Sequence, residues 1–192
     1  MVLLSSLFTE FADSKSLFHE AKQVVYQNSR GKVWLVGGFL YRHLAHFLYN
    51  SPPPDCDLDF IVTEREPMLK LPSDWREEHN SFGNPRLVSS KCRINLIPLD
   101  NIYSITQLGL SPMIHNYFYG VPLTIQAMAY DLQEQKILGD GFWDLYQKIV
   151  GVHNLKFAED LAAKQGKSVE ELVKEKAESL GFTPIIQDSS FQ

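Results

Sequence analysis

The sequence lacks the features that would mark a membrane or secreted protein. No apolar stretch approaches the roughly 20 residues needed to cross a bilayer, so a membrane-spanning segment is excluded on length. The short apolar run at residues 1–11 has no basic residue ahead of it, so a signal peptide is not expected. Cysteine is scarce, and the two present, Cys56 and Cys92, fall within expected strands as buried free thiols. A reducing cytoplasm fits this cysteine usage best.

Concentrated positive charge is also missing. The chain carries 18 Lys and Arg against 23 Asp and Glu, a formal net charge of −5. The basic residues are scattered, and the longest local excess, residues 70–93, is interrupted by Glu77 and Glu78. Because proteins that grip a nucleic-acid backbone usually concentrate Lys and Arg on one surface, strong independent binding to RNA or DNA is not expected.

What the chain does contain is enough apolar material for one core, 44% hydrophobic residues with 12% aromatics. Apolar spacing predicts helices at two places within residues 4–30 and at residues 39–48, 101–119, 142–150, 155–165 and 168–180. Strands are predicted at residues 32–36, 56–63, 93–99, 123–130 and 136–138, with a proline-rich loop at residues 50–54. Ser168 and Glu171 form a capping-box pattern, and Gly181 is the expected stop of that last helix. We interpret residues 1–154 as a head and residues 155–192 as a C-terminal helical extension whose charged residues form solvated faces.

Two aspartates stand in the strand predicted after the proline-rich loop. In an extended strand residues i and i+2 point to the same face, so Asp57 and Asp59 aim both carboxylates to one side, with Cα atoms about 6.6 Å apart. Such a pair suits divalent cations, which prefer oxygen ligands and can activate an attacking hydroxyl. Taken alone, the pair also fits aspartates that are solvated or that cap a turn.

A glycine pair, Gly37-Gly38, stands between a predicted strand and a predicted helix about twenty residues earlier. Backbone N–H groups and the N-terminus of a helix can receive a phosphate there, and glycine permits close approach. The same pair also fits a tight turn chosen for backbone geometry alone.

Two blocks of sequence in this order resemble a known family. VWLVGGFLYRHL at residues 33–44 and DLDFIV at residues 57–62 are similar to the head domain of the DNA polymerase beta nucleotidyltransferase superfamily, most of all to tRNA CCA-adding enzymes and bacterial poly(A) polymerases. PLTIQAMAYD at residues 122–131, KILGDGFWDL at residues 136–145 and VGVH at residues 150–153 form the second block. The resemblance covers about Val33 to His153.

The resemblance implies an α+β nucleotidyltransferase fold, a mixed and mostly antiparallel sheet packed on helices. It implies that Gly37 and Gly38 hold the triphosphate of an NTP, and we include Arg42, the cation that follows this turn, as a nucleotide-binding candidate. It also implies that Asp57 and Asp59 are the catalytic residues and bind two Mg²⁺ ions. These ions drive attack of a hydroxyl on the α-phosphate.

One position departs from the pattern at the metal site. Many members of the superfamily carry a third carboxylate on the next core strand, where this chain has Asn95. Asparagine offers one neutral oxygen, which weakens the attraction for a divalent ion and removes a possible base. Either the alignment of this short strand is displaced or this subclass uses two acids.

Groups that handle nucleotide and primer are also replaced. An Arg-Asp pair that follows the glycine turn in the family is Tyr41-Arg42 here, and Gly120-Val121-Pro122 stands where Arg-Arg-Asp is expected. The family's asparagine in the second block is Gln126. The residues from 155 to 192 are too few to replace the neck, body and tail domains of CCA-adding enzymes, so CCA addition is not inferred.

Two hypotheses remain open. The first is a metal-dependent nucleotidyltransferase that moves a nucleoside monophosphate from an NTP to an unidentified hydroxyl, on a small molecule, a protein or an RNA held by another subunit. The second is a degenerate head that binds a nucleotide or a partner protein without turnover, or that serves as a subunit of a split RNA-processing enzyme.

Overall fold

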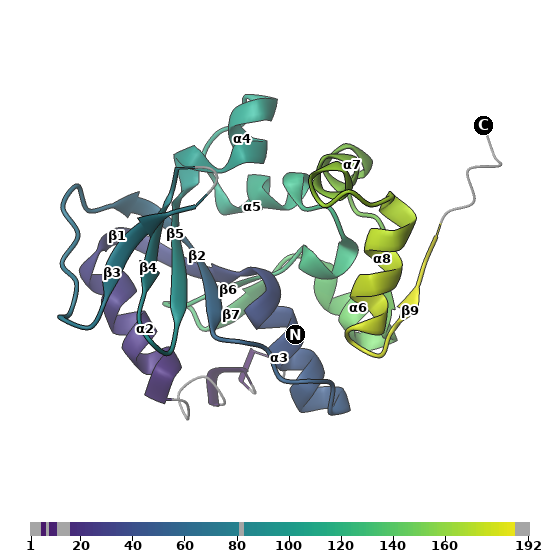
Figure 1. Cartoon of the computed structure of the whole chain (residues 1–192), viewed down its shortest axis with the longest axis horizontal. Helices are drawn as coiled ribbons and strands as arrows, with labels where there is room; N and C mark the ends of the chain where they lie inside the picture. Colours follow the sequence, from purple (N-terminus) through teal and green to yellow (C-terminus); the bar gives the residue numbers. More distant parts are fainter. Residues whose placement is uncertain (1–4, 7, 11–15, 81–82, 187–192) are drawn as a thin grey trace.

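The computed structural model describes residues 5–6, 8–10, 16–80 and 83–186. A seven-stranded sheet in the order β3-β4-β5-β2-β1-β6-β7 forms its centre (Figure 1). The strands of this sheet are β1 (Ser29–Val36), β2 (Asp57–Arg65), β3 (Arg76–His79), β4 (Pro85–Val88), β5 (Arg93–Pro98), β6 (Ala129–Asp131) and β7 (Lys136–Leu138). The α-helices are α2 (Ser16–Gln27), α3 (Gly37–Tyr49), α4 (Tyr103–Leu108), α5 (Ile114–Tyr117), α6 (Gly141–Gln147), α7 (Leu155–Lys164) and α8 (Val169–Glu178).

The register of the central strands places the end of β1 and Asn95 of β5 on either side of Asp59. β1 pairs antiparallel with β2 on one side and with β6 on the other, whereas β2 pairs parallel with β5. Val36, the last residue of β1, is the partner of Asp59, and Asp59 is in turn the partner of Asn95. The sheet is thus mixed and mostly antiparallel, which confirms the predicted α+β architecture.

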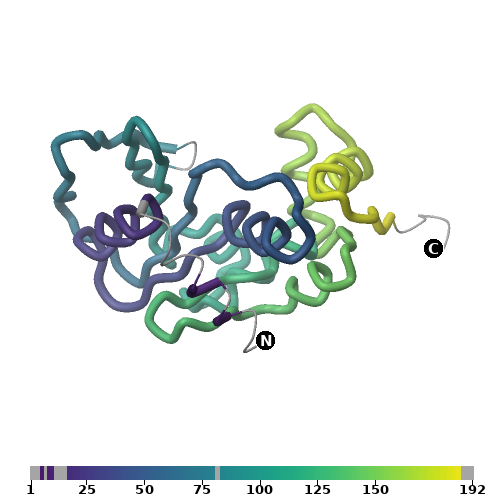
Figure 2. Tube along the Cα trace, turned by 90° about the horizontal axis from the view of Figure 1, so that it is seen from below, coloured from purple at the N-terminus to yellow at the C-terminus, as the bar shows by residue number. Residues whose placement is uncertain are grey.

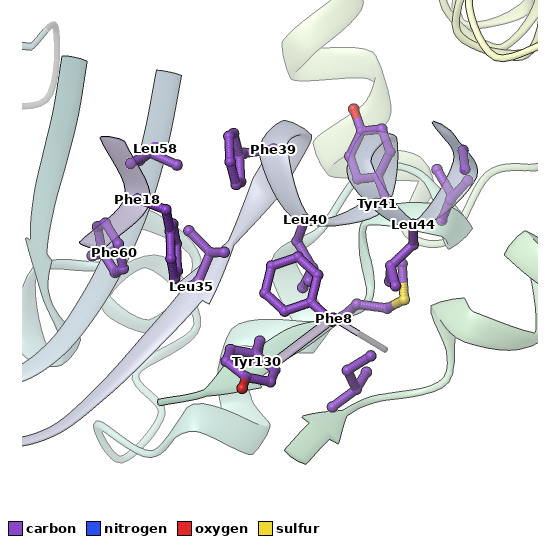
Figure 3. Close-up of a cluster of buried hydrophobic side chains, with 14 of the residues drawn as sticks. Phe8, Phe18, Leu35, Phe39, Leu40, Tyr41, Leu44, Leu58, Phe60 and Tyr130 are labelled. Carbon is purple, nitrogen blue, oxygen red and sulfur yellow. The ribbon is translucent and has the colours of Figure 1, made fainter. Parts of the chain in front are cut away.

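One face of the sheet carries the main core. Alternate residues of β1 and β2 point to this face, as the period of two in a strand requires, and meet apolar side chains of α2 and α3. In Figure 3 the rings of Phe18, Phe39 and Phe60 lie close together, and the centroids of Phe18 and Phe39 are 5.9 Å apart in a stacked pair. Phe60 and Leu35 are fully buried, so the two strands are anchored against the helices.

The opposite face is covered by α4 and α5, which lie above the strands in Figure 1. Trp34, Ile61 and Ile105 belong to the buried cluster on this side. Because β1 is covered on both faces, its last four residues are all buried. Asp57 and Asp59 stand at the start of β2 and share this second face with Ile61.

The C-terminal helices lie at the end of the molecule away from the β3–β4 hairpin (Figures 1 and 2). A short parallel pair, β8 (Ile149–Val150) with β9 (Thr183–Pro184), ties the chain after α8 to the chain after α6. Leu172, Val173 and Ala177 of α8 belong to the main core. Those residues of the extension that the structure describes therefore pack on the same core as the head, while the boundary at residue 154 stays a prediction.

Several predicted elements are confirmed closely. The strand at residues 136–138 has the predicted bounds, and α3, β5 and α7 match within two residues. Ser168 and Glu171 form both bonds of the capping box, and Gly181 has the positive φ of 71° typical of a helix stop. Of the two helices predicted within residues 4–30, the second is α2; residues 5–6 and 8–10 are also helical, and residues 11–15 between them and α2 lie outside the described residues.

Other predictions were wrong. The strand predicted at residues 123–130 begins as a 3₁₀ turn, η3 (Thr124–Gln126), because the Gln126 side chain accepts a hydrogen bond from the backbone N–H of Leu123. The helix predicted over residues 101–119 is broken between α4 and α5 at Gly109, which has a φ of 61°. It also begins and ends in 3₁₀ turns, η1 (Leu99–Asn101) and η2 (Phe118–Gly120). The helix predicted at residues 142–150 ends at Gln147, and the chain continues as β8.

The hairpin of β3 and β4 was not predicted. All four residues of β3 are exposed, so the strand has no apolar alternation to reveal it. Cys56 and Cys92 were placed within strands, but each lies one residue before one, ahead of β2 and β5. Both thiols are free. No helix among the described residues is long and apolar enough to cross a membrane.

We expect Leu172→Ala to lower the free energy of unfolding of the whole chain by about 2–4 kcal/mol, because Leu172 is buried in the main core. The control is Leu155→Ala on α7, an exposed side chain whose loss should cost less than about 0.5 kcal/mol. Urea unfolding should show one transition for both variants. A second transition that shifts alone in Leu172→Ala would show that the extension is a separate unit.

Candidate functional site

The glycine turn lies between β1 and α3. Gly37 has a φ of +75°, a conformation that residues with a side chain rarely adopt, and a Cβ added there would overlap Oδ2 of Asp59. Both constraints require glycine at this position. Gly38 has no such restriction, since a Cβ there would meet nothing closer than the Tyr41 hydroxyl at 3.7 Å. A small side chain at position 38 would therefore fit, and the space above Gly38 is open.

The N-terminus of α3 has no side-chain cap, because its N-cap residue is Val36. The N–H groups of the first turn of a helix have no intrahelical partner and carry a partial positive charge. In α3, which is 13 residues long, these groups begin at the glycine turn. This end of the helix can receive an anion.

Asp59 is held by two neighbours on the sheet. Its Oδ1 accepts a hydrogen bond of 2.8 Å from Nδ2 of Asn95, and Oδ1 of Asn95 accepts one of 3.0 Å from Nε of Arg86. Asn95 therefore lies directly beside Asp59 on the neighbouring strand. The Asn95 amide presents its N–H to the carboxylate, however, and turns its oxygen toward Arg86.

Burial, together with a smaller contribution from the nearby charge of Asp57, raises the pKa of Asp59 to about 6. The hydrogen bond from Asn95 and the charge of Arg86 act in the opposite direction without cancelling the effect of burial. The hydrogen bond and the positive charge that the protein supplies thus do not fully offset the cost of burying the ionised carboxylate. A cation bound beside it would stabilise the charged form.

Asp57 lies two residues earlier on the same face and is partly exposed. Its Oδ1 is buried and has no hydrogen-bond partner among the described residues, whereas its Oδ2 lies 3.7 Å from a guanidinium nitrogen of Arg93. A buried carboxylate oxygen without a donor fits a missing cation ligand. The described residues contain no group of three or more His, Cys, Asp and Glu side chains that could hold a metal, so a metal here would rest on the two aspartates.

A polar cavity of about 310 Å³ joins these groups. The lining residues are Gly38, Phe39, Tyr41, Arg42, Pro53, Pro54, Asp55, Asp57, Asp59 and Lys176. Four of the six predicted site residues thus line one cavity, which we call the polar cavity. Of the other two, Gly37 packs on Asp59 at the edge and Asn95 bonds to Asp59 from the next strand.

Lys176 is the lining residue that the sequence analysis missed. It belongs to α8, in the extension whose charged residues were interpreted as solvated faces, and it lies more than 100 positions from every other lining residue. No local pattern signals such a contact, because only the docking of α8 on α3 creates it.

A second cavity, of about 260 Å³, is also lined by Asp59 and is bordered by residues of α4 and α5. Its lining residues are Val36, Gly37, Asp59, Ile61, Asn80, Asn84, Ile97, Asn101, Ile102, Tyr103 and Tyr117. We call it the neutral cavity, because Asp59 is the one ionised side chain at neutral pH among these lining residues. Burial and, to a smaller extent, the charge of Asp59 raise the pKa of Tyr117, so its hydroxyl stays protonated. Asp59 therefore lines both a polar cavity and a largely apolar one.

Comparison with known proteins identifies the fold. No family model matches the chain, and no curated protein matches its sequence. A solved tRNA-processing enzyme with CTP superposes with a TM-score of 0.51 at 17% identity, covering 80% of this chain and 40% of that protein. A tRNA nucleotidyltransferase complexed with a primer tRNA and an incoming ATP analog superposes with a TM-score of 0.52 at 15% identity, covering 80% and 43%. The chain has the nucleotidyltransferase fold, as predicted, and spans less than half the length of these two proteins.

The pH dependence of stability should report the burial of Asp59. Because its pKa is about 6 in the folded protein and ordinarily 3.8, the folded chain binds this proton more tightly than the unfolded chain does. The contribution of Asp59 to the free energy of unfolding is therefore greatest below about pH 4 and falls as the pH rises to about 6. Above about pH 6 the free energy of unfolding is lower than at pH 4 by on the order of 1–3 kcal/mol.

We therefore expect Asp59→Asn to be more stable than the wild type at about pH 7.5 in EDTA, with the difference disappearing near pH 4. Urea unfolding of both proteins across this range measures the effect. A variant that is equally stable or less stable at neutral pH would contradict the assigned pKa.

The two glycines should respond differently to alanine. We expect Gly37→Ala to lower the free energy of unfolding by about 1–3 kcal/mol, because of the positive φ and the overlap with Asp59. Gly38→Ala, the matched control, should change it by less than about 0.5 kcal/mol. Thermal or urea unfolding measures both variants. If Gly37→Ala and Gly38→Ala lowered the free energy of unfolding equally, the turn would not require glycine at position 37 in particular.

Proposed function

We propose that this chain is a metal-dependent nucleotidyltransferase, which moves a nucleoside monophosphate from an NTP to a hydroxyl acceptor. One observation carries the proposal. The glycine turn at the start of α3 and the carboxylates of Asp57 and Asp59 meet at one polar cavity, in a fold shared with tRNA nucleotidyltransferases.

The phosphates would bind at the glycine turn. Gly38 lines the polar cavity without filling it, and the uncapped N-terminus of α3 favours negative charge there. Arg42, one turn further along α3, adds a positive charge to the same wall. These groups orient a triphosphate toward the two aspartates.

Asp57 and Asp59 would hold Mg²⁺, which fits the unpartnered Oδ1 of Asp57 and the under-compensated charge of Asp59. When bound, Mg²⁺ supplies charge neutralisation on the reacting phosphate and lowers the pKa of a bound hydroxyl. The protein fixes the two carboxylates, since Asn95 and the packing against Gly37 prevent Asp59 from turning away.

The acceptor hydroxyl would approach through the neutral cavity. This cavity borders the same Asp59 carboxylate as the polar cavity, so a hydroxyl within it can come close to a phosphate bound beside Asp59. No Lys or Arg is among its lining residues, so its chemistry suits an uncharged hydroxyl compound better than a phosphate backbone. The free thiols of Cys56 and Cys92 suit a reducing compartment such as the cytoplasm.

A second candidate function is a degenerate head that binds a nucleotide without turnover. The observation that favours it is the hydrogen bond that Arg86 donates to the side-chain oxygen of Asn95. Asn95 stands where many members of the superfamily have a third carboxylate, and this bond engages its one oxygen. Asn95 in this orientation contributes no oxygen to a cation held by Asp59. Binding would then survive while transfer is lost.

Calorimetric titration with each NTP in the presence of Mg²⁺ tests the binding step. We expect the wild type to bind and Asp57→Ala to lose at least about tenfold in affinity, because one of two acidic ligands is removed. Asp57 is partly exposed, so the variant should keep the melting temperature of the wild type. Absence of Mg²⁺-dependent binding in the wild type would remove the proposal.

Transfer is tested separately with α-labelled NTPs and a cell extract as the source of acceptors. The expected result is a labelled product that disappears in Asp59→Ala. Binding without any labelled product would instead support the degenerate head.

A further inference from the structure

Two cations reach the polar cavity from different parts of the chain. Arg42 comes from α3, and Lys176 comes from the last turn of α8, far away in sequence. Both side chains are partly buried. They share the cavity wall with Gly38, while Asp55, Asp57 and Asp59 provide the acids.

Contacts between α8 and the head hold Lys176 in this place. An Nη atom of Arg42 donates a hydrogen bond of 3.4 Å to Oγ of Ser179, which follows α8 directly. The buried hydroxyl of Ser51 donates a bond of 2.7 Å to the backbone oxygen of Leu180. The Lys176 ammonium lies 5.7 Å from the centroid of the Tyr41 ring, a distance typical of a cation–π contact.

The charge of Lys176 differs from that of its neighbours on the same segment. Lys167 is paired with Glu175 and Lys174 with Glu170, both by short N–O contacts. Within the described part of the chain, Lys176 has no carboxylate partner within 4 Å, and neither has Arg42. Two partly buried cations that face a cavity without carboxylate partners favour an anionic ligand.

We propose that Lys176 is a phosphate-binding residue, which α8 contributes to the triphosphate site together with Arg42. The inference rests on the proposed function and extends it to the C-terminal segment. In this arrangement the acids of β2 face the reacting phosphate, and the two cations face the outer phosphates that leave as pyrophosphate. Helix α8 is then part of the wall of the nucleotide site.

The ligand class follows from the same charges. A nucleoside monophosphate has no outer phosphates to contact Arg42 and Lys176. A nucleoside triphosphate or inorganic triphosphate supplies phosphate oxygens both to these two cations and to the cation held by the acids. Lys176 therefore discriminates by the number of phosphates and contributes little to the choice of base.

The test compares Lys176→Gln with Lys174→Gln, which removes the same charge from an exposed site one half-turn away on α8. Calorimetry in Mg²⁺ would use ATP, inorganic triphosphate and AMP as probes. We expect Lys176→Gln to weaken ATP and triphosphate about tenfold or more and to leave AMP within about twofold. Lys174→Gln should leave all three probes within about twofold, and Lys176→Arg should restore most of the affinity because it keeps the charge.

Equal affinities for ATP and triphosphate in Lys176→Gln and Lys174→Gln would overturn this inference while leaving the proposed function intact. Equal losses for AMP and ATP would also overturn it, since they would indicate a structural role. A wild type that binds none of the probes removes both proposals. A Lys176-dependent affinity for triphosphate, in a protein that transfers no label, supports the site and removes the transferase.

Discussion

The carboxylate of Asp59 lies where three parts of the fold meet, and the geometry of the candidate site depends on how it is held. Its strand runs antiparallel to β1 and parallel to β5, so the end of β1 flanks it on one side and Asn95 on the other. Gly37 leaves room for one carboxylate oxygen, and Asn95 donates a hydrogen bond to the other. A single buried acid therefore explains why glycine stands in the turn and why an amide is placed beside it.

Burying Asp59 raises the free energy of its ionised form, and this cost favours the binding of a cation beside it. A carboxylate taken out of water favours its neutral form unless opposite charge is near, and here the pKa is raised to about 6. Arg86 acts on Asp59 through the intervening Asn95 amide, and Arg93 faces the neighbouring Asp57 instead. The protein leaves part of the charge uncompensated, which is the condition under which a bound cation both stabilises the fold and becomes available for chemistry.

The two cavities that Asp59 lines differ in the chemistry they can accept. The polar cavity combines acids, a glycine turn and two cations from separate helices, which matches an anionic ligand bound with a cation. The neutral cavity is lined by apolar, amide and phenol groups. The fold shared with tRNA nucleotidyltransferases does not decide the acceptor, because the same fold supports different chemistry through the side chains that line its cavities.

The sequence by itself determined those features that depend on a few neighbouring residues: the central strands, the glycine turn and the aspartate pair. Alternation located β1, β2 and β5, the glycine pair located the turn, and the spacing of Asp57 and Asp59 placed two acids on one face. These features were predictable because strand period, glycine conformation and capping each act over a few residues. Even within this range the fully exposed β3 was missed, since a strand without apolar alternation has no such pattern.

Only the tertiary structure decided which way the Asn95 amide points, which oxygen of Asp57 lacks a donor, and that Lys176 faces the glycine turn. Each of these depends on contacts between segments far apart in the chain. Side chains such as Lys176 look like ordinary solvated charges in sequence, because nothing near them records the surface against which their helix will pack.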